Sequence, residues 1–134
     1  MKDICKIIVL STILISFGKG QCDEGEVDLW GECYSINIVS LDLTDSGLTG
    51  EIPPEIGELT NLTSLVLRYN ELTGPIPSTM GNLTSLVKLE LQYNNLSGSI
   101  PAELWSLDSL TQFRIQKNQC FPQIRDPSRN VCFS

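Results

Sequence analysis

Apolar residues recur with a period of 24 residues along most of the chain, together with regularly placed asparagine, glycine and proline. One copy of the pattern reads LTSLVLRYNELTGPIPSTMGNL over 62–83, and the next reads LVKLELQYNNLSGSIPAELWSL over 86–107. The same columns continue upstream to Ile38 and downstream to Asn118. Such a fixed period predicts a stack of similar coils, in which each coil buries its apolar face against its neighbours.

Within each coil, the pattern predicts one short strand, a turn and an extended return path. Leucines two positions apart, such as Leu65 and Leu67, share one face of a strand. The asparagine after each strand can donate and accept hydrogen bonds with turn backbone in its own and the adjacent coil. Glycine then permits a positive φ or a close approach, and proline keeps the preceding residue extended. These columns are Asn70, Asn94 and Asn118, then Gly50, Gly74 and Gly98, then Pro53, Pro77 and Pro101.

The consensus N-x-L-[ST]-G-x-I-P resembles the plant-type class of leucine-rich repeats, and the resemblance covers residues 36–120. That class includes receptor-kinase ectodomains, polygalacturonase-inhibiting proteins and short secreted relatives, and similar repeats occur in secreted bacterial proteins. The resemblance implies an α/β-type repeat solenoid with one parallel β-sheet of about four strands on its concave side. It also implies an irregular or short-helical convex side and capped ends.

The chain is predicted to divide into four segments. Lys2 and Lys6 precede an apolar run over 7–17 and small residues at 18 and 20, which is typical of a secretory signal peptide cut before Gln21. The run is too short to span a bilayer, and no later stretch is apolar enough. We therefore expect a secreted protein, extracellular or at the cell surface, whose mature chain is not inserted in a membrane. The predicted segments are 1–20, signal peptide; 21–36, N-terminal cap; 37–119, leucine-rich repeats; and 120–134, C-terminal cap.

The first and last coils depart from the consensus. Ser46 stands where asparagine is expected, and an end coil with only one neighbour tolerates the loss of that amide. Trp105 stands where the earlier coils have Gly57 and Gly81. This substitution indicates a last coil that is widened toward the C-terminal cap.

Charge and composition restrict the classes of function. The net charge is −7, and it becomes −9 when residues 1–20, with three lysines and one aspartate, are removed. An acidic chain of this kind does not favour nucleic acid or an anionic membrane as a partner. The chain has no histidine, no P-loop and no G-x-G-x-x-G motif. The sequence therefore predicts a non-enzymatic protein without cofactors.

Acidic residues in the predicted N-terminal cap suggest calcium as a ligand. Their spacing matches no EF-hand loop, so the sequence favours a solvated acidic cap and no metal site. These residues are Asp23, Glu24, Glu26, Asp28 and Glu32.

Four cysteines follow residue 20, and four cysteines allow three pairings. A secreted chain uses such cysteines in disulfides rather than in zinc sites. Disulfide-bonded Cα atoms lie about 4.4–6.8 Å apart, whereas the ends of a four-coil stack lie roughly 15 Å or more apart. The separation excludes cap-to-cap bridges and predicts the pairs Cys22–Cys33 and Cys120–Cys132.

Three sequons of the form N-x-[ST] lie within the repeats. They arise in part from the repeat consensus itself. In a eukaryotic secretory pathway, the predicted glycosylation sites are Asn61, Asn82 and Asn95.

The strand positions between the leucines are predicted to face outward on the concave side and to form a binding surface. Aligned coils place Tyr69 beside Tyr93, with Arg68 next to them, and tyrosine and arginine are enriched in binding hot spots. A stacked tyrosine pair can equally serve only to stabilise adjacent strands. The predicted partner-binding residues are Arg68, Tyr69, Lys88, Glu90, Gln92, Tyr93, Arg114 and Lys117.

These observations favour a non-enzymatic extracellular binding module that recognises a protein or peptide. The alternative is a structural cell-wall or surface component, or a truncated receptor-like relic, without a dedicated ligand. A third hypothesis is direct binding of ice or carbohydrate. Regular exposed columns of threonine or serine favour this third hypothesis, and the strand face lacks them.

Overall fold

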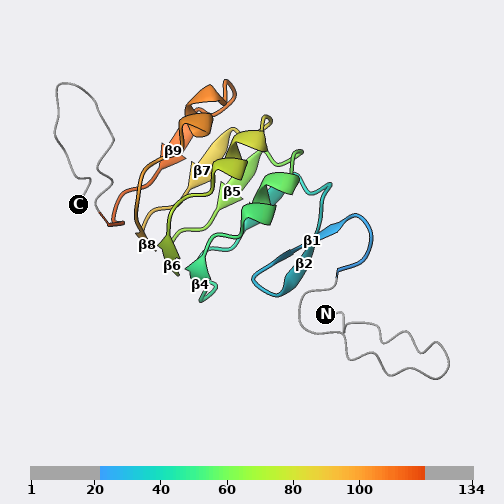
Figure 1. Cartoon of the computed structure of the whole chain (residues 1–134), viewed down its shortest axis with the longest axis horizontal. Helices are drawn as coiled ribbons and strands as arrows, with labels where there is room; N and C mark the ends of the chain where they lie inside the picture. Colours follow the sequence, from blue (N-terminus) through green and yellow to red (C-terminus); the bar gives the residue numbers. More distant parts are fainter. Residues whose placement is uncertain (1–21, 120–134) are drawn as a thin grey trace.

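Each repeat of the sequence forms one coil, and the coils lie side by side with equivalent residues adjacent (Figure 1). The structure is a computed structural model, and it describes residues 22–119 of the 134-residue chain. The predicted signal peptide and C-terminal cap, together with the predicted Cys120–Cys132 bridge, lie outside the described residues.

The larger β-sheet is parallel and contains one strand from each coil, in the order β3-β5-β7-β9. Its register equals one repeat, so Leu65 pairs with Leu41 on one side and with Leu89 on the other. The inward leucines are buried and form a single core that runs through all the coils. The sequence prediction of a four-stranded parallel sheet is therefore confirmed. The strands are β3 (Ser40–Asp42), β5 (Ser64–Val66), β7 (Lys88–Glu90) and β9 (Gln112–Arg114).

A second, smaller parallel sheet lies where the sequence indicates only an extended return path. Its register is 22 residues rather than 24, so Gly50 pairs with Leu72 and not with Gly74. This offset does not follow the repeat columns, and for that reason the column alignment does not predict the sheet. Its strands, in spatial order, are β4 (Thr49–Glu51), β6 (Glu71–Gly74) and β8 (Asn95–Leu96).

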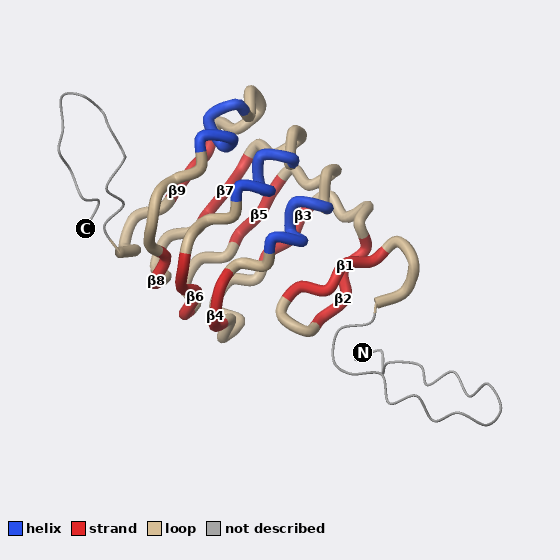
Figure 2. Tube along the Cα trace, in the orientation of Figure 1, coloured by secondary structure: helices blue, strands red, loops and turns tan. Residues whose placement is uncertain are grey.

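A 3-10 helix of five residues closes each of the return paths that follow β3, β5 and β7, on the side away from the larger sheet (Figure 2). An extended proline precedes each helix, namely Pro53, Pro77 or Pro101. The convex side is thus short-helical, as the sequence predicts. The helices are η1 (Pro54–Glu58), η2 (Ser78–Asn82) and η3 (Ala102–Ser106).

The asparagine column bonds each coil to the coil before it. Asn70 Nδ2 donates to the carbonyl of Leu43 in the preceding coil at 2.8 Å and to that of Leu67 in its own coil at 3.0 Å. Asn70 Oδ1 accepts the backbone N–H groups of Ser46 and Leu48, each at 3.0 Å. The predicted asparagine column is confirmed. Each asparagine bonds to the coil that precedes it, and this explains why the first coil can have Ser46 in place of asparagine. An asparagine in the first coil has no preceding coil to bond.

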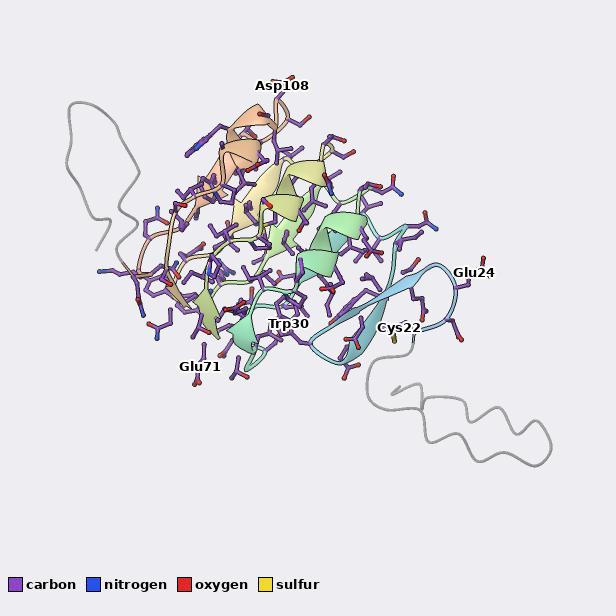
Figure 3. The ribbon with its side chains drawn as sticks, viewed as in Figure 1. Cys22, Glu24, Trp30, Glu71 and Asp108 are labelled. Carbon is purple, nitrogen blue, oxygen red and sulfur yellow. A yellow bond between two sulfur atoms is a disulfide. The ribbon has the colours of Figure 1, made fainter. Side chains whose placement is uncertain are left out.

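The N-terminal cap is an antiparallel hairpin of β1 (Glu26–Leu29) and β2 (Glu32–Ser35) that packs against the first coil. Val27 and Leu29 are buried in the common core. The Trp30 indole lies where the hairpin meets the smaller sheet (Figure 3), and its Nε1–H donates to the Glu51 carbonyl at 3.1 Å. The hairpin therefore covers the end of the solenoid at which the first coil has no neighbour.

The structure contains the predicted Cys22–Cys33 disulfide, with Cα atoms 5.5 Å apart. Replacing both cysteines with serine is expected to lower the free energy of unfolding by about 2–3 kcal/mol, because the bridge closes a loop of about a dozen residues in the unfolded chain. Urea denaturation of both proteins measures the difference. Peptide mapping that finds Cys22 bonded to Cys120 or Cys132 would contradict the assignment.

Trp105 does not widen the coil of β7 and η3, to which it belongs. Helix η3 has the same length as η1 and η2 and begins at the equivalent position, so that interpretation of the sequence is wrong. The Trp105 side chain instead points outward, with 61% of its surface exposed, and contacts the edge of Phe113 at a centroid distance of 6.1 Å. At the equivalent Gly57 and Gly81 the next 3-10 helix stacks closely, and among residues 22–119 no 3-10 helix follows η3.

Candidate binding surface on the strand face

The outer face of the larger sheet, with the turn residues that follow its strands, is called the strand face below. The pairing of β5, β7 and β9 brings the predicted partner-binding residues together on three neighbouring coils. Glu90, for example, lies between Val66 and Arg114. The sequence alignment of these columns is therefore confirmed, whereas their role in binding stays a prediction.

Tyr69 and Tyr93 stack on the strand face. Their ring centroids are 4.4 Å apart with an interplanar angle of 12°, and both side chains remain about half exposed, at 49% and 44%. The Arg68 guanidinium lies 6.0 Å from the centroid of the Tyr69 ring. This arrangement presents a flat aromatic surface with a cation at its edge.

Both tyrosines occupy left-handed backbone, with φ of 58° at Tyr69 and 60° at Tyr93. The equivalent Asp45 and Lys117 share this conformation, so it belongs to the turn and not to the aromatic residue. A side chain with a Cβ atom costs about 1–2 kcal/mol there, and glycine or asparagine would cost less. The fold alone does not require tyrosine at these positions. Stacking against the neighbouring coil offsets part of the cost.

Glu90 lies at the centre of a group of cations. Its carboxylate oxygens are 3.4 Å from Lys88 Nζ, 3.5 Å from Arg68 Nη1 and 3.8 Å from Arg114 Nη1. Only 3% of Glu90 is exposed, since the longer basic side chains of its own and adjacent coils cover it. Glu90 therefore positions the three cations. A partner on this face would contact the cations and not Glu90 itself, which they cover.

Gln92 is also buried, with 6% of its surface exposed. Its Nε2 donates to Glu90 Oε2 at 3.4 Å, whereas its Oε1 has no hydrogen-bond partner among residues 22–119. Strand periodicity places Gln92 outward but does not predict its burial. How deeply Gln92 is buried depends on how far the side chains of adjacent coils extend over it.

The β3 end of the strand face is acidic and was not assigned to the site from the sequence. Hydrogen bonds from the Thr44 hydroxyl, at 2.6 Å, and the Thr44 backbone N–H, at 3.0 Å, lower the pKa of Asp42. Asp42 therefore stays ionised at neutral pH. Thr44 Oγ1 also accepts a hydrogen bond from Arg68 Nε at 3.3 Å, which connects the acidic end to the cations.

The acidic cap gives no calcium geometry among residues 22–119. The only group of potential ligand atoms that converges there is Cys22, Glu26 and Cys33, and both sulfur atoms belong to the disulfide. Oxidised sulfur of this kind is not the thiolate that binds a metal. The acidic side chains of the cap are mostly exposed, and Glu24 points outward from it (Figure 3).

The three sequon asparagines are exposed and lie off the strand face. Asn82 belongs to η2 and Asn95 to β8, and Asn61 precedes β5. Glycosylation of these residues stays a prediction.

The fold and the repeated columns define a leucine-rich repeat solenoid, and the chain belongs to the leucine-rich repeat family. The family model described as "Leucine rich repeat" matches residues 36–96 and again residues 60–119. The repeats are of the plant type, since similar solved structures include leucine-rich repeat ectodomains of plant receptors.

Three solved plant structures illustrate the similarity. The peptide hormone receptor RGFR1, in complex with RGF2, is 34% identical with a TM-score of 0.61, over 77% of this chain and 18% of the receptor chain. The BIR3–SERK2 complex from Arabidopsis thaliana gives 36% identity and a TM-score of 0.58, over 71% of this chain and 50% of the matched chain. A plant ice-binding protein gives 30% identity and a TM-score of 0.52, over 82% of this chain and 41% of the ice-binding protein. The chain thus spans half or less of each of these proteins.

Comparison with curated protein sequences gives no match. Within residues 22–119, no helix has the length and apolarity that are needed to cross a membrane.

Proposed function

We propose that the protein is an extracellular module that recognises a protein or peptide through its strand face. The observation that carries this proposal is the half-exposed Tyr69–Tyr93 stack beside Arg68. Tyrosine and arginine are enriched in binding hot spots, and here the tyrosines persist on backbone that disfavours them. A turn that served only to connect the strands would not need two exposed aromatic rings.

The similar structures support a role in recognition. RGFR1 was solved with RGF2, and BIR3 was solved with SERK2, so two of the three structures described above are complexes with a partner. The ice-binding neighbour supports the third hypothesis, but the strand face carries mixed charges rather than a uniform hydroxyl column. We therefore favour a peptide or protein ligand, with secretion directed by residues 1–20.

The tyrosine pair provides the test. A Tyr69→Ala/Tyr93→Ala variant is expected to lose about 2 kcal/mol or more of partner affinity, which is roughly a thirtyfold weakening. Its free energy of unfolding is expected to fall by only about 0.5–1.5 kcal/mol through loss of the aromatic pair. The partner is first captured from the native extracellular fluid with the mature domain and identified by mass spectrometry. Affinity is then measured by calorimetry with the purified partner.

Trp105→Ala is the matched control, because it removes an exposed aromatic ring from η3, away from the strand face. This control should bind the partner as the unmodified protein does. Unchanged affinity in a folded double-tyrosine variant would refute the proposed surface. Loss of affinity in the control alone would place the site at the other side of the coil.

A further inference from the structure

The charges of the described residues are segregated. Residues 22–119 contain fourteen acidic and four basic residues. All four basic residues lie on the strand face, in or just after strands β5, β7 and β9. They are Arg68, Lys88, Arg114 and Lys117. The part of the chain over 22–119, acidic elsewhere, thus presents one basic area, and such a pattern attracts an anionic partner and repels a cationic one.

Glu90 does not neutralise this area. One buried carboxylate faces three cations, and the side chains of Arg68, Lys88 and Arg114 remain 39%, 35% and 56% exposed. The excess positive charge is therefore available at the surface. Distances of 3.4–3.8 Å from Glu90 leave the cations free to form closer contacts with a ligand.

Gln92 provides an independent sign of a ligand. Its Oε1 is a buried acceptor without a donor among the described residues, and its Nε2 donates to Glu90, the carboxylate that the three cations surround. An unpaired buried acceptor costs about 1–3 kcal/mol, so a donor from outside would be favourable there. The N–H group of a peptide backbone is such a donor.

The opposite end of the face carries the opposite sign. Asp42 and Asp45 are exposed beside β3, whereas Arg114 and Lys117 are exposed beside β9. The face therefore discriminates between the two orientations of a ligand that itself carries an uneven charge.

We propose that the β7–β9 part of the strand face binds an acidic peptide segment in extended conformation. Carboxylates of the segment pair with Arg68, Lys88 and Arg114, and draw these side chains away from Glu90. A backbone N–H of the segment then donates to the uncovered Gln92 Oε1. This inference rests on the proposed function and adds the chemical class of the ligand.

Two labelled peptides test the inference. The mature protein is titrated with a short fluorescein-labelled peptide of alternating serine and glutamate, and with the matching serine and lysine peptide, by fluorescence anisotropy. We expect binding of the glutamate peptide alone, and weakening as salt is raised. Arg114→Gln should weaken binding roughly two- to fivefold. Glu90→Gln, which removes the internal anion without changing the shape, should strengthen it by a similar factor.

Asn82→Asp is the matched control, because it changes the net charge by the same amount as Arg114→Gln but lies on η2. The inference is overturned if both peptides bind equally, if neither binds, or if the control weakens binding as much as Arg114→Gln does. It is also overturned if Glu90→Gln weakens binding in a protein that is folded by circular dichroism. If the tyrosine variant still loses its natural partner in those cases, the ligand class is wrong while the strand face remains the site.

Discussion

Asn94→Ala is expected to lower the free energy of unfolding by about 3–5 kcal/mol, the largest effect of any single polar substitution proposed here. Asn94 Nδ2 donates to the carbonyls of Leu67 and Leu91 at 2.9 and 3.1 Å, and its Oδ1 accepts the Leu72 N–H at 3.1 Å. The side chain is buried between two coils, where water cannot replace it. Alanine therefore leaves the Leu72 N–H without a partner, at a cost of about 1–3 kcal/mol. It also removes one of two side-chain donors at each of the Leu67 and Leu91 carbonyls, which keep Asn70 and Asn118, at about 0.5–1.5 kcal/mol each.

Asn95→Ala is the control for this prediction, because it is the same substitution at the next residue. Asn95 is exposed and its side chain makes no hydrogen bond in the described part of the chain, so we expect a change within about 0.5 kcal/mol. Urea denaturation of non-glycosylated protein measures both values, since Asn95 lies in a sequon. Equal losses in the two variants would show that the asparagine column does not hold the coils together.

Gly57→Ala is expected to destabilise the protein by about 3 kcal/mol or more. A Cβ atom on Gly57 would lie within 3 Å of the backbone of Thr79 in η2, and a backbone cannot move aside without shifting the whole helix. The stacked 3-10 helices would have to separate, and this opens the apolar core between two coils. Thermal unfolding followed by circular dichroism measures the loss.

The same column supplies two controls for Gly57→Ala. Trp105→Ala changes a residue on which no 3-10 helix stacks among residues 22–119, and we expect a loss of at most about 1 kcal/mol from the Phe113 contact. Gly81→Ala meets the Cβ of Glu103 at 2.5 Å, and Glu103→Gly should therefore restore part of the stability. Rescue is not expected at Gly57, where the obstacle is backbone. A loss of less than about 1 kcal/mol in Gly57→Ala would mean that η1 and η2 are not in close contact.

The sequence alone determined the stacked-coil architecture, because a coil of this size is stable only when its apolar columns meet the same columns in its neighbours. The position of the leucines therefore predicts the strands, and the position of Asn94 predicts the bonds between turns. The Cys22–Cys33 pair follows from the same stacking, since the length of the stack excludes bridges between its ends.

Only the tertiary structure decided the features that depend on adjacent coils. The smaller sheet pairs residues with an offset of 22, so its register arises from how the turns sit together and not from the columns. Glycine is required at position 57 by Thr79 of η2 and at position 81 by Glu103 of η3, whereas among residues 22–119 no 3-10 helix stacks beyond Trp105. Glu90 and Gln92 alternate outward along their strand, but long side chains from three coils cover them. Burial of a surface position depends on its neighbours in space, and a single strand does not contain that information.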